Sequence, residues 1–348
     1  MKKTVLLILF FAVSVSVLAQ SKSMKNYYYW TNQAELAICD SNYAYANECF
    51  DKAFSYHKPL DRDLSIAYKL NTVFTGDTSR IYRYATQKLL WGQEDIALYY
   101  SKLSSYDTNI YHHLLYLEQT IAPDYDTVLR NKLEAILDRD QSYPHTCTAN
   151  PKEDSLNHAI MKDILDLYAH YKTINDYTAG YKFFDFYLDV PCYHHVMYPM
   201  RNILGLLKKE MKKGNLAADK YMDLADAYQW QRYYWSHNAK EPNGYGVDAN
   251  ITLIGNCLIL VLPNDIRKVN KNRRRLGISE TFEDYVRKMV WQFNSEGIRF
   301  YLTHRLTSGD AAEDAAEAAK WKREIDAEHA KCDFHRMYFE KGSKVSER

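Results

Sequence analysis

Small and large apolar residues recur at fixed intervals between Trp30 and Pro59, and this spacing constrains the fold more than any other feature. Intervals of three, four and seven residues place side chains on one face of an α-helix. Ser41 interrupts the pattern near its middle. The stretch therefore predicts two antiparallel helices joined by a turn at Ser41, with Pro59 ending the second helix. The defining residues are Trp30, Ala34, Tyr43, Ala46, Phe50 and Ala53.

The same pattern returns twice in weaker form. Thr75-Gly76-Asp77 predicts a turn between two further helices, and a third pair is expected over 96–121, before Pro123. Three pairs are about the minimum that buries a continuous repeat core. The chain has only 12 Gly and 8 Pro among 348 residues, which favours long helices. The residues that carry the second and third pairs are Leu64, Ala67, Tyr82, Ala85, Leu89, Ile110, Leu114 and Leu117.

This spacing resembles the tetratricopeptide repeat over about residues 27–123. The resemblance implies an all-α array of antiparallel helix pairs with an inner face that binds a peptide or protein. The chain is also rich in Tyr, with 31 residues. We expect these rings to pack between helices, and a groove that stacks carbohydrate or peptide is the alternative.

Helical periodicity continues beyond the repeats. The apolar run from Ile251 to Leu262 predicts a central buried helix, although its composition also allows a strand. We expect repeats over 20–124, a second helical domain over 125–300, and a C-terminal helix and tail over 301–348. The helices predicted after the repeats cover residues 125–140, 157–171, 181–188, 199–212, 217–236, 281–301 and 310–339.

The N-terminus has the pattern of a secretory signal peptide. Lys2 and Lys3 precede an apolar run, and a small-residue sequence ends at Ala19. The run is about 15 residues long, short of the ~20 that a bilayer span needs, so we favour cleavage after Ala19 over a retained anchor. The sequence therefore predicts a periplasmic or secreted protein without stable membrane insertion after cleavage. Among its six Cys, Cys147 and Cys192 are the expected disulfide pair.

Charge does not select a polyanionic partner. Without residues 1–19 the chain carries 43 basic and 44 acidic residues. A nearly neutral exported protein is not expected to bind nucleic acid. Six basic residues nevertheless gather between Arg267 and Arg275; they predict a solvated turn, or else a site for a phosphate or an acidic partner.

Residues 130–292 resemble an uncharacterised family of bacterial helical domains. The resemblance depends on Asp140-Gln141, a segment ending in His194-His195, a stretch around Asp226, and Tyr245-Gly246; Asn270, Arg273, Arg274, Leu276, Gly277 and Tyr285 follow. Ala227 departs from the pattern, because an Arg follows the corresponding Asp in the family. If the family has a polar site, this chain lacks part of it.

Two groups of residues are candidate sites. Asp140, His195, Asp226 and Tyr245 would form an acid-base or metal-assisted hydrolase site if they converge, since a carboxylate beside a His is the minimal machinery for such chemistry. We favour the alternative that they cap helices and satisfy buried backbone groups. His329, Cys332 and His335 recur every third residue on the predicted last helix; they suit zinc or copper, or else form an exposed face with a packed Cys.

The sequence contains no nucleophile elbow, Gly-rich phosphate loop or His-Glu-x-x-His helix, so no cofactor is predicted. The preferred function is an exported helical-repeat scaffold that binds a peptide or an envelope protein. A hydrolase or metal-assisted enzyme with its site in the second helical domain is the alternative.

Overall fold

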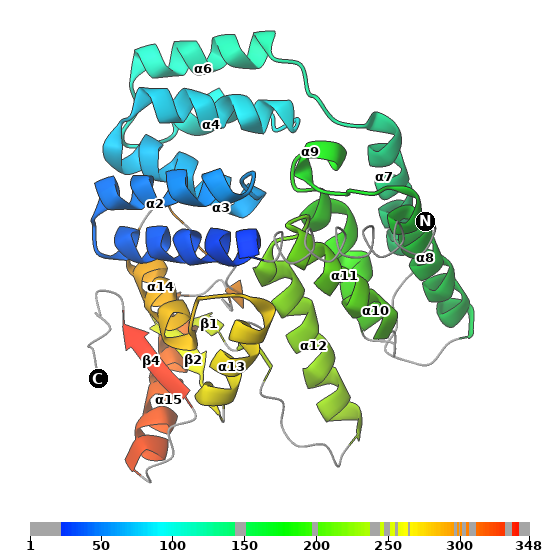
Figure 1. Cartoon of the computed structure of the whole chain (residues 1–348). Helices are drawn as coiled ribbons and strands as arrows, with labels where there is room; N and C mark the ends of the chain where they lie inside the picture. Colours follow the sequence, from blue (N-terminus) through cyan, green and yellow to red (C-terminus); the bar gives the residue numbers. More distant parts are fainter. Residues whose placement is uncertain are drawn as a thin grey trace, which may run out of the picture.

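The fold is all-α, as predicted, with a small sheet beside the helices (Figure 1). The structure is a computed structural model. It describes residues 22–142, 151–196, 201–236, 244–246, 251–254, 257–263, 265–295, 298, 300, 304–305, 311–330 and 336–340. The predicted signal peptide, residues 1–19, and Cys147 lie outside the described residues.

The N-terminal helices stack side by side, each sequential pair being joined by a short turn (Figure 1). Ala34, Ala46 and Ala53 are fully buried, so the helix backbones approach closely where the spacing requires small residues. The predicted turn after the third helix forms at Gly76, whose φ of 66° is left-handed. The assignment to the tetratricopeptide type stays a prediction. The elements are helix 22–39, α2 (Tyr43–Tyr56), α3 (Asp61–Leu70), η1 (Asn71–Thr75), α4 (Thr78–Leu90), α5 (Ile96–Ser101) and α6 (Thr108–Thr120).

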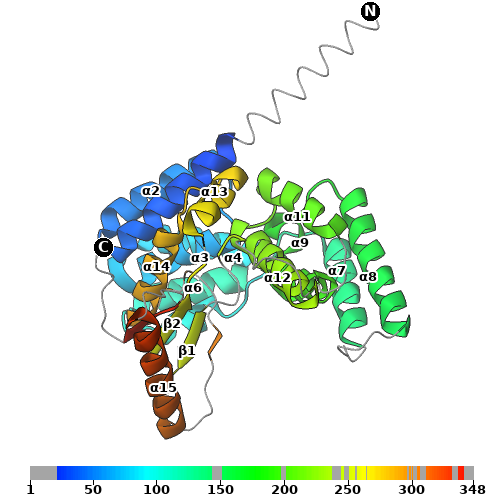
Figure 2. The same cartoon turned by 90° about the horizontal axis from the view of Figure 1, so that it is seen from below.

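A second group of helices lies beside the stack and packs around a second apolar core, to which Met24, Tyr27 and Ala53 of the N-terminal helices also contribute (Figure 2). Cys192, predicted to lie in a disulfide-bonded loop, is instead a buried free thiol in a helix, so that prediction is wrong. The elements are α7 (Thr127–Gln141), α8 (Pro151–His170), α9 (Asp176–Ala179), η2 (Phe184–Leu188), α10 (Asp189–Val196), α11 (Arg201–Lys213) and α12 (Ala218–Ser236).

The predicted central helix over 251–262 is wrong, because this segment forms a β-hairpin. Its strands pair antiparallel, and the sheet order is β3-β1-β2-β4. Leu258 and Leu260 pack with the N-terminal core, whereas Ile259 packs against the last helix. Both faces of the strand are therefore covered, and such a strand has the same continuous apolar pattern as a buried helix. The strands are β1 (Ile251–Ile254), β2 (Cys257–Val261), β3 (His304–Arg305) and β4 (Arg336–Glu340).

The last helix ends earlier than predicted. The predicted helix over 310–339 is a shorter helix, α15 (Ala311–Ala330), followed by β4, which pairs with β2. Sheet pairing overrides helix propensity there. Two more helices, α13 (Ile266–Leu276) and α14 (Phe282–Asn294), precede α15. Within the described part of the chain, no helix combines the length and the apolar character needed to cross a membrane.

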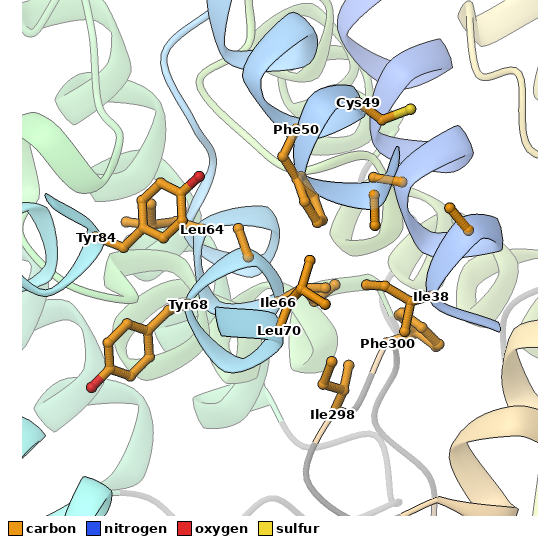
Figure 3. Close-up of a cluster of buried hydrophobic side chains, with 14 of the residues drawn as sticks. Ile38, Cys49, Phe50, Leu64, Ile66, Tyr68, Leu70, Tyr84, Ile298 and Phe300 are labelled. Atoms are coloured by element: carbon orange, nitrogen blue, oxygen red, sulfur yellow. The ribbon is translucent and has the colours of Figure 1, made fainter. Parts of the chain in front are cut away.

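The C-terminal half covers the inner side of the first helices. Ile298 and Phe300 lie against Ile38 in the same buried cluster that contains Ile66 and Leu70 (Figure 3). Helix α14 contributes to this cluster, which thus joins segments more than two hundred residues apart. The apolar packing therefore unites the N-terminal helices with α14, across the predicted domain boundary at 124.

Candidate functional site

Asp140 and His195 occupy neighbouring helices. Asp140 is fully buried near the end of α7, where its Oδ2 accepts a hydrogen bond from Gln141 Nε2 at 2.8 Å. Burial, together with the charges of Asp189 and Asp140, raises the pKa of the Cys192 thiol on α10. His195 lies on α10, which packs against α7, but its side chain is outside the described residues. Gln141 and a protonated thiol are thus among the neighbours of Asp140.

The fold brings Asp226 and Tyr245 together, and the contact joins the Asp226 side chain to the Tyr245 backbone. Tyr245 donates its backbone N–H to Asp226 Oδ1 at 2.6 Å. At Gly244, a Cβ atom would lie 1.9 Å from this oxygen, so the contact requires glycine. The Tyr245 ring is 6.0 Å from that of Tyr221, and burial raises the pKa of its hydroxyl. The buried Asp226 carboxylate therefore anchors the 244–246 segment.

The predicted metal ligands fall largely outside the described structure. His329 belongs to α15, but its side chain, and the whole of Cys332 and His335, lie outside the described residues. Among the side chains that are described, no three His, Cys, Asp or Glu residues gather closely enough to hold a metal ion.

The basic run is helical, so its interpretation as a solvated turn is wrong. It forms α13, which Gly277 ends in a left-handed conformation with φ 89°. Most of its cationic side chains are exposed, but Arg273 is fully buried and binds Glu280 at 2.7 Å. Arg273 Nε also donates to the Tyr245 carbonyl at 2.7 Å. One cation of the run is therefore part of the core.

A buried charge cluster links the N-terminal helices to α14. Lys288 is 1% exposed and binds both Glu35 and Glu280, the latter at 2.6 Å. It also donates to Asn32 Oδ1 at 2.5 Å. A buried ammonium is tolerated only when it is paired and hydrogen-bonded. Lys288 meets this condition partly through Asn32 and Glu35, which lie more than 250 positions away in the sequence. We call this group the Lys288 cluster; it consists of Asn32, Glu35, Arg62, Glu280 and Lys288.

Arg62 extends the cluster to α3. Its guanidinium binds Glu35 at 2.7 Å and Asp63 at 3.0 Å, and its Nε donates to the Phe300 carbonyl at 2.8 Å. Tyr27 donates to the other Asp63 oxygen at 2.6 Å. Burial raises the pKa of Asp63 to about 7, with Arg62 opposing the shift and Glu35 adding to it. Asp63 is therefore a carboxyl group that titrates near neutral pH.

Sequence reasoning missed this cluster, although a signal existed. Glu35 lies between Ala34 and Ala37 on the buried face of its helix, and Lys288 is next to the buried Met289. Charged residues at core positions of an amphipathic helix are rare unless paired. Their positions pointed to buried ion pairs, but the sequence did not say which residues pair.

A pocket lies between α7 and α8. Its volume is about 440 Å³. Ile136 and Leu167, both buried, form its floor, and the exposed Lys132, Asp166 and His170 lie along its rim. Arg139 on α7 forms an ion pair with Asp163 on α8. We call this feature the α7–α8 groove; it has an apolar floor and a rim with charges of both signs.

A second, much smaller cavity borders the Lys288 cluster. Its volume is about 40 Å³, and it lies where helix 22–39, α3, α12 and α14 meet. A cavity of this size holds a few water-sized groups and is far below the ~300 Å³ of an ordinary ligand pocket. It is lined by charged groups and by apolar side chains that include Leu60 and Met222.

Comparison with known proteins identifies no relative. No protein-family model matches the chain, and neither the curated proteins nor the solved structures include a significant match.

Proposed function

We propose that the protein is an exported helical-repeat scaffold that binds a peptide segment of an envelope protein in the α7–α8 groove. The observation that carries this proposal is the groove itself. Its volume of about 440 Å³ lies within the range of about 300–1,000 Å³ that is typical of binding pockets. An apolar floor with a polar rim is also the usual anatomy of a protein interface.

The covered inner face of the repeats supports this choice of surface. Repeat arrays usually bind along the inner helices. Here Ile298, Phe300 and α14 pack against those helices, and Lys288 binds Glu35 there. A partner at that face would have to displace buried apolar groups and ion pairs. The α7–α8 groove needs no such displacement.

The groove also suggests what the bound segment carries. Lys132, Arg139 and His170 offer donors on its rim, whereas Asp163 and Asp166 offer acceptors. An amphipathic helix with apolar anchors three and four residues apart, and with mixed charges beside them, matches this pattern. We therefore propose a helical or helix-forming partner segment.

The test is affinity capture from the organism's own envelope extract with a matched pair of charge-reversal variants. Asp166→Lys changes the groove rim, and Asp138→Lys makes the same change at an exposed α7 position outside the groove. We expect the mature chain and Asp138→Lys to retain one partner in stoichiometric amount and Asp166→Lys to lose most of it. Equal recovery with both variants, or an empty eluate from the unmodified chain, contradicts the proposal.

Export is tested on the same sample. Amino-terminal sequencing of the protein from the envelope fraction is expected to begin at Gln20, the residue after the proposed cleavage point. A chain that begins at Met1 and remains in the cytoplasmic fraction would contradict export without bearing on the groove.

A further inference from the structure

The small cavity beside the Lys288 cluster contains an unexplained polar group. Tyr28 is 9% exposed, its hydroxyl is fully buried, and among the described residues that hydroxyl has no hydrogen-bond partner. Tyr28 lines the cavity. A buried hydroxyl without a partner is costly, so an occupant of the cavity is expected to bond to it.

The charges around the cavity indicate the sign of that occupant. Four carboxylates line it and only two cations do. Both cations are already shared: Lys288 binds Glu35 and Glu280, whereas Arg62 binds Glu35 and Asp63 and its Nε also lies 3.9 Å from Asp219 Oδ2. The four carboxylates are Glu35, Asp63, Asp219 and Glu280.

Cations behind the cavity wall do not remove this imbalance. Arg273 binds Glu280 at 2.7 Å. Lys220 acts on Asp219, but it also binds Asp185 at 2.8 Å and lies near Asp189. Lys288, Arg62 and Arg273 are thus divided among four carboxylates, and Asp219 has only the long contact to Arg62 and a share of Lys220. Burial is the main cause of the raised pKa of Asp63; Arg62 opposes the shift, and Glu35 and Asp219 add to it.

We propose that this cavity binds a primary ammonium group, carried either by a small alkylamine or by a lysine side chain. An ammonium has three N–H donors and no acceptor, which suits the Tyr28 oxygen and the carboxylates of Asp63 and Asp219. Burial and the charges of Asp63 and Asp219 raise the pKa of Tyr28, so its hydroxyl stays neutral and its oxygen can accept. Leu60 and Met222 provide an apolar wall for the carbon next to the nitrogen.

The test uses methylammonium chloride as the probe with the full mature chain. Isothermal titration calorimetry and thermal unfolding are expected to show saturable, one-to-one binding at pH 8. Methanol, which has the same size without the charge, and sodium chloride at equal ionic strength should produce no saturable response. Nα-acetyl-lysine amide separates the two sources: tighter binding than methylammonium identifies a lysine side chain, and weaker binding identifies a small amine.

Tyr28→Phe is the decisive variant, because it removes only a hydroxyl that has no hydrogen-bond partner in the described part of the chain. The fold should therefore be unaffected, and affinity for methylammonium should fall about tenfold, which is the loss expected for one hydrogen bond to a charged group. Tyr29→Phe, an exposed neighbour, is the matched control and should bind as the unmodified chain does. If Tyr28→Phe binds equally well, or if neither amine binds saturably, the proposal is wrong and the cavity holds only water.

Affinity should also depend on pH. Asp63 gains a proton as the pH falls through about 7, while the ammonium stays charged, so binding should be weaker at pH 6 than at pH 8. The charged and titratable groups facing Asp63 are Arg62, Glu35, Tyr27, Tyr28 and Asp219. Asp63→Asn should bind more weakly at pH 8 and lose most of this pH dependence. Affinity that does not change between these pH values would argue against a role for Asp63 in the site.

Discussion

The inner side of the first helices and the α7–α8 pair are both amphipathic surfaces, but the chain covers only one of them. Helix 22–39 is joined to α14 by a buried ion pair, and α3 is joined to Phe300 by packing and a hydrogen bond. Helices α7 and α8 are sequential neighbours, and the groove between them is lined mostly by exposed side chains. The first helices are therefore held by the rest of the chain, whereas the second pair leaves a groove with an exposed rim.

The largest expected effect is a loss of stability when the ion pairs of Lys288 on the covered side are removed. Lys288→Met keeps most of the side-chain volume but removes the buried cation that Glu35 and Glu280 share. Among the described residues, Glu35 then keeps its ion pair with Arg62, and Glu280 keeps its ion pair with Arg273. We expect the free energy of unfolding to fall by about 3–5 kcal/mol in urea denaturation. Lys271→Met, at an exposed position on α13, is the control and should change stability by less than about 0.5 kcal/mol. A loss below about 1 kcal/mol at Lys288 would mean that the cluster does not hold the covered side together.

The second-largest effect is a pH dependence of the free energy of unfolding, which we expect from the buried Asp63 and not from exposed carboxylates. The pKa of Asp63 is about 7 in the folded chain and 3.8 ordinarily. The folded chain therefore binds more protons than the unfolded chain between these values, and stability falls as the pH rises from about 4 to about 7. Each pKa unit corresponds to about 1.4 kcal/mol, so the full change is about 2–4 kcal/mol.

Urea denaturation at pH 5 and at pH 8 measures this dependence. Asp63→Asn should reduce the difference between the two pH values, because it removes the titrating group while its amide oxygen can still accept from Tyr27. Asp124→Asn, at an exposed position, should leave the difference unchanged. An unchanged difference in Asp63→Asn would assign the pH dependence to another group.

The smallest effect is expected in the groove. Asp166→Lys alters an exposed rim position and should change the free energy of unfolding by less than about 0.5 kcal/mol. The measurement is the same urea titration, compared with Asp138→Lys. A loss as large as that at Lys288 would mean that the α7–α8 groove is also structural, and the contrast between the two surfaces would disappear.

Helix positions were the most predictable part of the fold. The predicted turn at Thr75-Gly76-Asp77 forms, and the α7 and α12 boundaries lie within two residues of the expected ones. Local signals suffice there because turns, caps and periodicity act over a few residues. The candidate site residues were less predictable. Asp226 and Tyr245 do meet, but as a carboxylate and a backbone amide, a contact that side-chain chemistry does not indicate.

The sequence by itself determined that the chain forms stacked amphipathic helices, because small residues such as Ala34 and Ala46 recur where two backbones must approach. Only the tertiary structure decided that Leu258 to Leu260 form a strand and that Lys288 reaches Glu35 across 253 positions. A strand covered on both faces has no distinguishing period. The partner of a buried charge is set by packing, which no local pattern specifies.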